Sequence, residues 1–240
     1  MKSISGISSS LLPDFAILYT ASNCALDNVP NLEYSTIDEL IQKTKKIQAD
    51  IVLTCDKELI RNGIADEFKK NRLNIICVNK KWSNIEKSKL IAKQLLSHYS
   101  INCPQTLLCP TAFPVVLKLD DSDNTQKFFA NSMHELIDKR LEWENIFQNK
   151  KMFIEEYLKG DEYSLLILWD MKNALSFPVD NDEHNINLTE VQIDRLELLK
   201  TKLNFMLSDE QADFTGFLVL KLLWAKTFCI KTFVRKNNHS

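Results

Sequence analysis

The sequence contains very little glycine: its 240 residues include only four, at positions 6, 63, 160 and 216. Average usage would give roughly seventeen. Loops that hold phosphate groups usually contain glycine, because only glycine combines a positive φ with the absence of a side chain in the ligand's way. The scarcity of glycine therefore counts against an intact catalyst that grips phosphates with a glycine-rich loop.

An excess of positive charge is also missing, since the formal net charge is −2 and the isoelectric point is near 6.1. Nucleic-acid binding through a broad basic face is therefore not expected. The longest apolar runs, such as LLILW at 165–169, are far shorter than the ~20 residues of a membrane helix. The N-terminal MKSISGISSSLLP lacks the continuous apolar stretch of a signal peptide. We expect neither a nucleic-acid partner nor a membrane.

Metal-binding spacings are absent as well. The six cysteines, at 24, 55, 77, 103, 109 and 229, include no C-x₂-C pair, and the four histidines complete no zinc motif. Four of the cysteines lie within or beside apolar runs, which favours buried free thiols over disulfides. Free thiols are typical of a reducing compartment, so the sequence predicts a cytoplasmic protein.

The chain does contain a regular alternation of short apolar runs and amphipathic segments in its first half. Strands alternating with helices over short links predict a parallel sheet with helical crossovers. Thr36 is the predicted N-cap of the first helix. The predicted strands are 15–19, 50–55 and 73–78, and the predicted helices are 36–49, 57–71 and 83–100.

The second half changes to strands that follow one another, after a predicted linker at 101–106. This order predicts an α+β unit, in which an antiparallel sheet carries a covering helix. The last two strands are expected to form a hairpin. The predicted strands are 114–118, 152–158, 162–170, 173–179, 214–225 and 226–234, and the predicted helices are 132–148 and 186–206.

Five segments, taken in order, resemble a known family. They are ADIVLTCDKELIRNGIADEF (49–68), NIEKSKLIAKQLL (84–96), PVVLK (114–118), FIEEYLKGDEYSLLI (153–167) and FTGFL (214–218). Over about residues 15–235 the chain is similar to the ATP-grasp ligases, and within them to glycinamide ribonucleotide synthetases (phosphoribosylamine–glycine ligases), whose role is the ATP-dependent formation of glycinamide ribonucleotide in purine biosynthesis.

The resemblance implies a fold and a domain division. The expected fold is α/β plus α+β. Residues 1–103 would form a parallel-sheet, Rossmann-like pre-ATP-grasp domain that lacks its first strand, and residues 104–240 a reduced ATP-grasp domain with antiparallel sheets. Within the latter, 104–179 would be the small subdomain and 180–240 the remnant of the large one.

The resemblance also implies five site residues. Lys89 and Lys118 match lysines that reach ATP phosphates, the backbone of Tyr157 and Leu158 matches the segment that binds the adenine edge, and Glu162 matches the acid that takes the ribose hydroxyls. The chemistry is coherent, because two cations neutralise phosphate charge and a carboxylate accepts from two hydroxyls. The neighbouring Glu155 and Glu156 are expected to be ordinary surface acids.

Departures from the family pattern predict lost chemistry. The acidic stretch DDSDNTQ (120–126) stands where the family has its glycine loop, and its carboxylates would repel phosphate. Lys231 and Phe233 stand where the family has the glutamate and asparagine that bind magnesium, which prefers oxygen ligands. Of the family's residues here, Arg235 alone is kept, and His184 is expected to be an exposed loop histidine.

Three hypotheses follow from these observations. In the first, the chain keeps the fold and at most residual nucleotide binding, with the magnesium site and ligase activity lost. In the second, it is an active ligase whose metal ligands are Asp120, Asp121 and Asp123. In the third, it is a non-catalytic interaction or regulatory module with a protein partner, and exposed tryptophans at 82, 143 or 224 would be its anchors, although their positions favour core packing.

Overall fold

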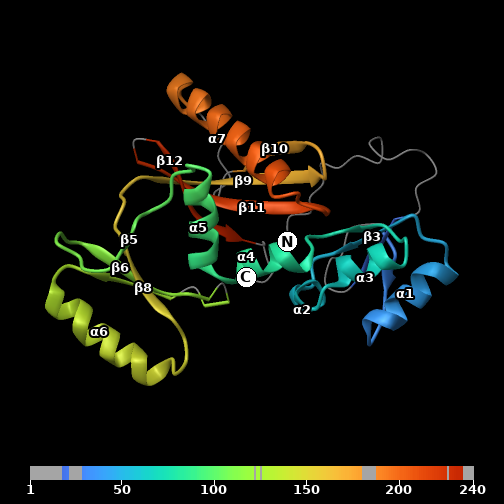
Figure 1. The fold of residues 1–240 in the computed structure, drawn as a ribbon, viewed down its shortest axis with the longest axis horizontal. Helices are drawn as coiled ribbons and strands as arrows, with labels where there is room; N and C mark the ends of the chain where they lie inside the picture. The colour runs from blue at the N-terminus through green and yellow to red at the C-terminus, as the bar shows by residue number, and fades with distance from the viewer. Residues whose placement is uncertain are drawn as a thin grey trace.

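The computed structural model describes residues 18–21, 29–121, 123–124, 126–179, 188–225 and 227–234 (Figure 1). In chain order its elements are β1 (Leu18–Ala21), β2 (Asn31–Leu32), α1 (Ile37–Lys46), β3 (Ile51–Thr54), α2 (Lys57–Arg61), α3 (Ile64–Lys70), β4 (Ile75–Ile76), α4 (Lys80–Lys87), α5 (Lys89–His98), β5 (Thr106–Leu107), β6 (Val115–Leu119), β7 (Lys127–Ala130), α6 (Met133–Ile146), β8 (Met152–Glu156), β9 (Asp161–Asp170), β10 (Ala174–Val179), α7 (Glu190–Asp209), β11 (Thr215–Trp224) and β12 (Phe228–Val234).

A large mixed sheet forms the body of the molecule. Its order is β10-β9-β11-β4-β3-β1-β2, and β12 pairs with β11 beside this path. The strands β1 to β4 are parallel, whereas β9 to β12 pair in antiparallel fashion and β11–β12 is the expected hairpin. The predicted fold class, a parallel N-terminal sheet followed by antiparallel sheets, is therefore confirmed. The predicted absence of a first strand concerns residues before Leu18, which lie outside the described residues.

The two halves of this sheet meet at one narrow junction. Thr215, the first residue of β11, pairs with Ile76 of β4, and this parallel contact makes the sheet continuous. A Cβ atom on the next residue, Gly216, would lie 2.8 Å from the carbonyl carbon of Cys77. Real Cβ atoms do not approach backbone that closely, so the junction requires glycine at this position.

Two predicted helices are interrupted, and each interruption has a local cause. The predicted helix 57–71 breaks at Gly63, whose φ is +87°, into α2 and α3. The predicted helix 83–100 breaks at Ser88, which has extended backbone angles (φ −111°, ψ 115°), ends α4 and caps α5 by accepting a hydrogen bond from the Ile91 N–H. This second break makes Lys89 the first residue of α5. The predicted N-cap Thr36 is confirmed, since its side chain accepts from the Glu39 N–H.

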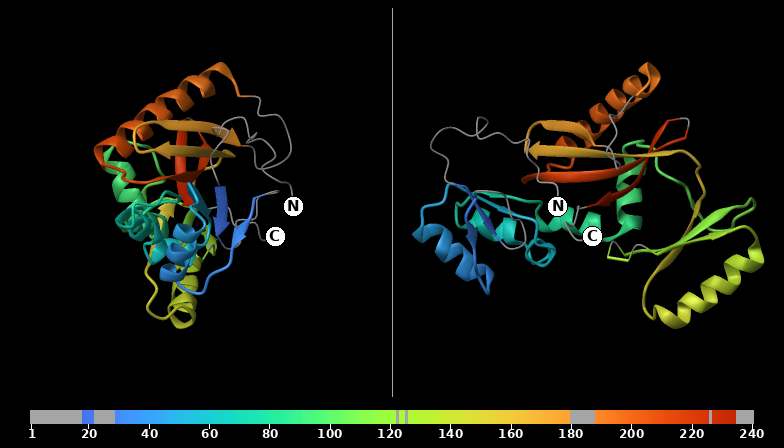
Figure 2. Two further views of the ribbon diagram at one scale, coloured as in Figure 1. Left: turned by 90° about the vertical axis from the view of Figure 1, so that its right-hand side faces the viewer. Right: turned by 180° about the vertical axis from the view of Figure 1, so that it is seen from behind.

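A smaller sheet, with the order β5-β8-β6-β7, lies at one end of the molecule and carries α6 on one face (Figure 2). The strands β5 and β7 were not predicted. Apolar side chains between this sheet and α6 form a second hydrophobic core, separate from the core of the large sheet. The buried members of the second core are Val115, Leu117, Leu119, Ala130, Leu136, Trp143 and Ile154.

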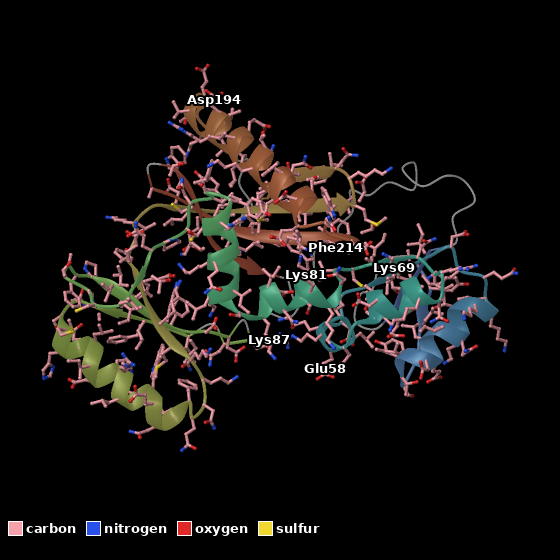
Figure 3. All side chains as sticks on the ribbon, in the orientation of Figure 1. Glu58, Lys69, Lys81, Lys87, Asp194 and Phe214 are labelled. Carbon is pink, nitrogen blue, oxygen red and sulfur yellow. The ribbon has the colours of Figure 1, made fainter. Side chains whose placement is uncertain are left out.

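The large core packs α7 and α4 against the antiparallel strands. Figure 3 labels Phe214, just before β11, and Lys81 on α4. The Phe214 ring packs on Trp82 with centroids 5.7 Å apart, and the Lys81 Nζ lies 2.8 Å from a carboxylate oxygen of Glu210. Trp82 and Trp143 are buried and Trp224 is half-buried. Core packing is therefore the role of Trp82 and Trp143, so neither is an exposed anchor for a partner.

The cysteines only partly follow the prediction. Cys77, Cys103, Cys109 and Cys229 are free thiols, and two of them, Cys77 and Cys229, are buried. The expectation of free thiols is wrong at Cys55, which is disulfide-bonded. Within the described ranges, no helix is both long and apolar enough to cross a membrane.

Candidate functional site

A buried ion-pair triad links the small sheet to α5. Lys118 of β6 and Lys93 of α5 both face Glu155 of β8. The Lys118 Nζ pairs with Oε1 of Glu155, and the Lys93 Nζ lies 2.9 Å from Oε2. The Glu155 side chain is only 3% exposed. The expectation that Glu155 is a surface acid is therefore wrong: it neutralises buried lysines, while Glu156 is half-buried and accepts a hydrogen bond from a backbone N–H.

The triad is short of negative charge and of hydrogen bonds. Lys93 also donates to the carbonyl of Pro104, and its contact with Glu155 Oε2 is an ion pair without hydrogen-bond geometry, which leaves that oxygen unsatisfied. Burial lowers the pKa of Lys118, although its pairing with Glu155 opposes this, and the nearby ammonium groups of Lys93 and Lys231 lower the pKa further. Two ammonium groups thus share one carboxylate in the interior.

Lys89, the other lysine predicted to bind phosphate, lies close to this triad. Its Nζ donates to the carbonyl oxygens of Leu119 (3.1 Å) and Asn124 (2.9 Å), which belong to the strand end and the loop that follow Lys118. Burial lowers the pKa of Lys89, and the ammonium group of Lys118 lowers it further. Ser88, the extended N-cap of α5, makes Lys89 the first residue of that helix, from where its side chain reaches these two carbonyl oxygens.

The acidic loop after Lys118 is tied to the N-terminal half of the chain. Asp120 accepts hydrogen bonds from the Ser88 hydroxyl and the Leu90 N–H, both at the start of α5. Asp123 pairs with Arg61 of α2 at 2.7 Å.

The remaining acid of the loop, Asp121, pairs with Lys150 at 2.5 Å. The three aspartates therefore have separate cationic or N–H partners. Among the residues that the structure describes, no group of three or more His, Cys, Asp or Glu side chains could hold a metal ion. The alternative of a rebuilt metal site at Asp120, Asp121 and Asp123 thus has no ligand set in this loop.

Glu162, the predicted ribose ligand, is the second residue of the long strand β9 and pairs with Lys231 of β12. The hydrogen bond from Lys231 lowers the pKa of the Glu162 carboxyl, and partial burial opposes this. The ammonium group of Lys231 also lowers the pKa of Lys118. Phe233 pairs with Leu220 through the β11–β12 ladder. His184 and Arg235 lie outside the described residues.

Tyr157 and Leu158, the predicted adenine-binding segment, cross from β8 of the small sheet towards β9 of the large one. Their backbone N–H and C=O groups form no hydrogen bond to any other described residue. The Tyr157 side chain is 40% exposed and its ring meets that of Phe129 edge-on at 5.6 Å. A Cβ on Gly160 would lie 1.9 Å from the carbonyl oxygen of Trp224, so the crossing is held tightly against β11.

Together these residues form what we call the lysine cluster: Lys89, Lys93, Lys118 and Lys231, with Glu155 and Glu162. Lys93 and Lys118 share one of the two carboxylates and Lys231 pairs with the other, whereas Lys89 pairs with neither. The carboxylates of Asp120 and Asp121 also act electrostatically on Lys89. Sequence reasoning missed Lys93 and Glu155. The available signal was that Lys93 follows Lys89 by four residues, a spacing that places both on one helix face.

Comparison with known proteins places this geometry in context. No protein-family model matches the chain. It is 26% identical over 195 residues to the phosphoribosylamine–glycine ligase of Fusobacterium nucleatum, a match that covers 73% of this chain and 45% of that protein. The crystal structure of the phosphoribosylamine–glycine ligase of Thermotoga maritima superposes with a TM-score of 0.63 at 20% identity, covering 85% of this chain and 58% of that one. The chain has a reduced ATP-grasp fold.

Other ATP-grasp ligases superpose equally well. An ADP complex of N5-carboxyaminoimidazole ribonucleotide synthetase gives a TM-score of 0.66 at 12% identity and covers 93% of this chain and 64% of that one. In sequence, the ATP-grasp chain resembles the phosphoribosylamine–glycine ligases, as its motifs predicted, and it spans about half the length of the curated relatives that it matches.

Proposed function

We propose that this ATP-grasp chain binds a nucleotide at the lysine cluster and does not catalyse ligation. The observation that carries the proposal is the proximity of Lys89 to Lys118, since Lys89 donates to the carbonyl of the residue after Lys118. The crossing segment that follows β8 adds to it, because its backbone groups at Tyr157 and Leu158 have no hydrogen-bond partner among the described residues. Ammonium groups suit phosphate, and an extended backbone with open N–H and C=O groups suits the edge of a base.

The comparisons support a nucleotide as the ligand. The sequence relatives are ligases by name, and one structural neighbour was solved as an ADP complex. We further propose the domain division 1–103 and 104–240, with 104–179 as the small subdomain and 180–240 as the remnant of the large one. The range 104–179 contains the small sheet with α6, and also β9 and β10 of the large sheet. The cluster then lies where the small subdomain meets the other two, because Lys118 and Glu155 belong to the small sheet, whereas Lys89 and Lys231 come from outside it.

Two features support the absence of ligation. The loop 120–124 is held by its own aspartates against α2 and α5, and it takes up the hydrogen bonds of Lys89. Of the described carboxylates beside the cluster, Glu155 and Glu162 are engaged with lysines, Asp121 is paired with Lys150, and Asp120 accepts from the Ser88 hydroxyl and the Leu90 N–H. They supply no oxygen set for magnesium. Phosphoryl transfer from ATP ordinarily depends on such a cation to neutralise developing charge. A protein on this plan holds a nucleotide without using it.

A small apolar cavity also exists beneath α7, lined in part by Tyr163, Leu196 and Phe228, and it includes none of the cluster lysines. The nucleotide therefore replaces protein contacts of the lysines rather than filling this cavity. Residual rather than tight affinity is the consequence, since those contacts are lost on binding.

The test is the melting temperature of the whole chain with ATP, measured both with and without Mg²⁺. We expect ATP at millimolar concentration to raise it by a few degrees, as binding to the folded state requires. Lys89→Met should abolish the rise, whereas Lys70→Met, which removes an exposed lysine on α3, should leave it intact. Lys89 is the better variant than Lys118, because its partners are neutral carbonyls and its loss leaves no carboxylate unpaired.

The second half of the test is turnover. Incubation with phosphoribosylamine, glycine, ATP and Mg²⁺ should release no phosphate above the rate of a blank. Absence of any ATP-induced shift in either buffer contradicts the binding proposal, and phosphate release that depends on glycine contradicts the proposed loss of ligation.

A further inference from the structure

We infer that the lysine cluster binds the phosphates of its nucleotide without a divalent cation. The inference rests on the proposed function and concerns what neutralises the phosphates. In this chain the neutralising charges are ammonium groups, and a metal ion competes with them instead of assisting them.

The charges of the cluster support this directly. Lys89 has no carboxylate partner of its own, because its two hydrogen bonds go to carbonyl oxygens. Lys93 and Lys118 share the single carboxylate of Glu155, and Lys231 has that of Glu162. Asp120 and Asp121 also act on Lys89, and Asp121 is paired with Lys150, so five ammonium groups stand against four carboxylates. The remaining positive charge attracts a polyphosphate and repels a divalent cation by the same Coulomb interaction. Partial burial makes both effects stronger than they are in bulk water.

The oxygen donors point the same way. Magnesium requires near-octahedral oxygen ligands, commonly one or two carboxylates together with waters and substrate phosphates. One oxygen of Glu155 is paired with Lys118 and the other lies 2.9 Å from Lys93, so neither faces an open position. The described residues contain no cluster of acids that could replace it. A cation brought in on a nucleotide would gain no protein ligand there.

Binding also has a simple exchange on the protein side. Lys89 gives up two neutral carbonyl acceptors and donates to anionic phosphate oxygens instead, which adds an attraction between opposite charges that the carbonyl oxygens do not supply. Lys231, on β12 of the large sheet, is paired with Glu162, the residue predicted to bind the ribose of the same nucleotide. The metal-free nucleotide carries two more negative charges than its magnesium complex and therefore gains more from this exchange.

The experiment is a titration of the whole chain with ATP by isothermal calorimetry at one fixed ionic strength. One series contains EDTA and the other contains excess Mg²⁺. We expect the dissociation constant to be about three- to tenfold lower in EDTA, because the ligand then bears more negative charge. Tighter binding with Mg²⁺, or binding that requires it, overturns the inference but leaves the proposed function standing. Absence of binding in both series overturns the proposed function itself.

A variant pair ties the result to Lys231. Lys231→Gln should weaken ATP binding in EDTA by about five- to tenfold and remove most of the difference between the two series. The half-exposed Glu162 tolerates the loss of its partner, since water can solvate it. Lys70→Gln is the matched control and should leave both dissociation constants unchanged. Equal effects of the two substitutions would exclude Lys231 as the group that stands in for the metal.

Discussion

At the scale of single residues, Glu155 is the buried carboxylate that compensates the charges of two lysines. Its carboxylate is buried and faces the ammonium groups of Lys93 and Lys118. Removing one partner of a buried ion pair lowers the free energy of unfolding by more than the intact pair contributes to it, because a charge is left without compensation in the interior.

We therefore predict that Glu155→Gln lowers the free energy of unfolding by about 3–5 kcal/mol. Without the carboxylate, the folded-state pKa of Lys118 falls further below the ~10.4 of an unfolded lysine. The unfolded state then binds more protons than the folded state in this window, so stability rises with pH. The deficit of the variant relative to the unmodified protein should shrink between pH 8 and pH 10, as measured by urea unfolding.

The control is Glu144→Gln, which removes an exposed acid on α6 that pairs with Arg140. It should cost no more than about 0.5 kcal/mol at any of these pH values. A deficit of Glu155→Gln that stays constant with pH would indicate lost packing and not uncompensated charge.

The same residues show how far sequence reasoning reaches. Lys89 and Lys118 were assigned together from two motifs, and the structure brings them together. Glu155 and Glu156 look alike in the sequence, and only the pairing of β8 between β5 and β6 decides which of them is buried. Strand alternation separates their faces, but without the tertiary partners it does not say which face is the interior. The ion pair of Glu162 with Lys231 depends on a contact across 69 positions, which no local pattern reveals.

At the scale of elements, aspartates of the loop between β6 and β7 connect the small sheet to α2 and α5. Asp123 holds α2 through Arg61 and, at 3.5 Å, through Lys57, while Asp120 holds the start of α5. In the sequence pattern that the chain resembles, a glycine-rich phosphate loop follows β6. Here the aspartate side chains of this loop bind groups within the protein. Asp120 and Asp123 therefore link the small sheet to the N-terminal half by hydrogen bonds and ion pairs.

We predict that a double-mutant cycle of Asp123→Ala and Arg61→Ala gives a coupling energy of about 0.2–1 kcal/mol, the range of exposed ion pairs. The hydrogen bond from Arg61 lowers the pKa of the Asp123 carboxyl. Its contribution is therefore present above the unfolded pKa of about 3.9 and is lost as the pH falls through the lower folded value. Urea unfolding of the four proteins of the cycle, at pH 6 and again at pH 2.5, gives the coupling energy at each pH.

The pair Lys139→Ala and Glu142→Ala, within α6, is the matched cycle away from the loop. Coupling between Asp123 and Arg61 that persists unchanged at pH 2.5 would mean that the two side chains interact through packing.

Element boundaries were predictable where a local signal fixes them. The N-cap at Thr36 and the hairpin of β11 and β12 follow from capping chemistry and alternation. The break at Ser88 was missed, because helical periodicity continues through 83–100 and the extended conformation is imposed by Asp120, a residue 32 positions away. This break makes Lys89 the first residue of α5 and so sets the position of its side chain. The geometry of the site is therefore less predictable from the sequence than the identity of its residues.

At the scale of the whole molecule, one pair of residues joins the parallel and antiparallel halves of the large sheet. Thr215 pairs with Ile76, and Gly216 lies against the backbone of Cys77. Any side chain at 216 pushes the two strands apart at the point where the sheet is narrowest.

Gly216→Ala should therefore lower the free energy of unfolding by at least about 1–3 kcal/mol, the usual cost of overpacking. Gly63→Ala is the matched comparison: its added Cβ would lie 3.3 Å from a carboxylate oxygen of Asp66, a side chain that can shift by a few tenths of an ångström. The positive φ of Gly63 adds a strain of about 1 kcal/mol. Urea unfolding at neutral pH compares the two, and an equal or smaller loss for Gly216→Ala would contradict the steric role of the junction.

The separation of the two hydrophobic cores has a consequence for cooperativity. The lysine cluster lies between them, with Lys118 and Glu155 on the small sheet and Lys89, Glu162 and Lys231 on the larger body. A ligand held by both parts adds its binding free energy to the contact between them, about 2.7 kcal/mol at a hundredfold excess over the dissociation constant. If the proposed nucleotide binds there, its concentration determines whether the chain unfolds as one unit or as two.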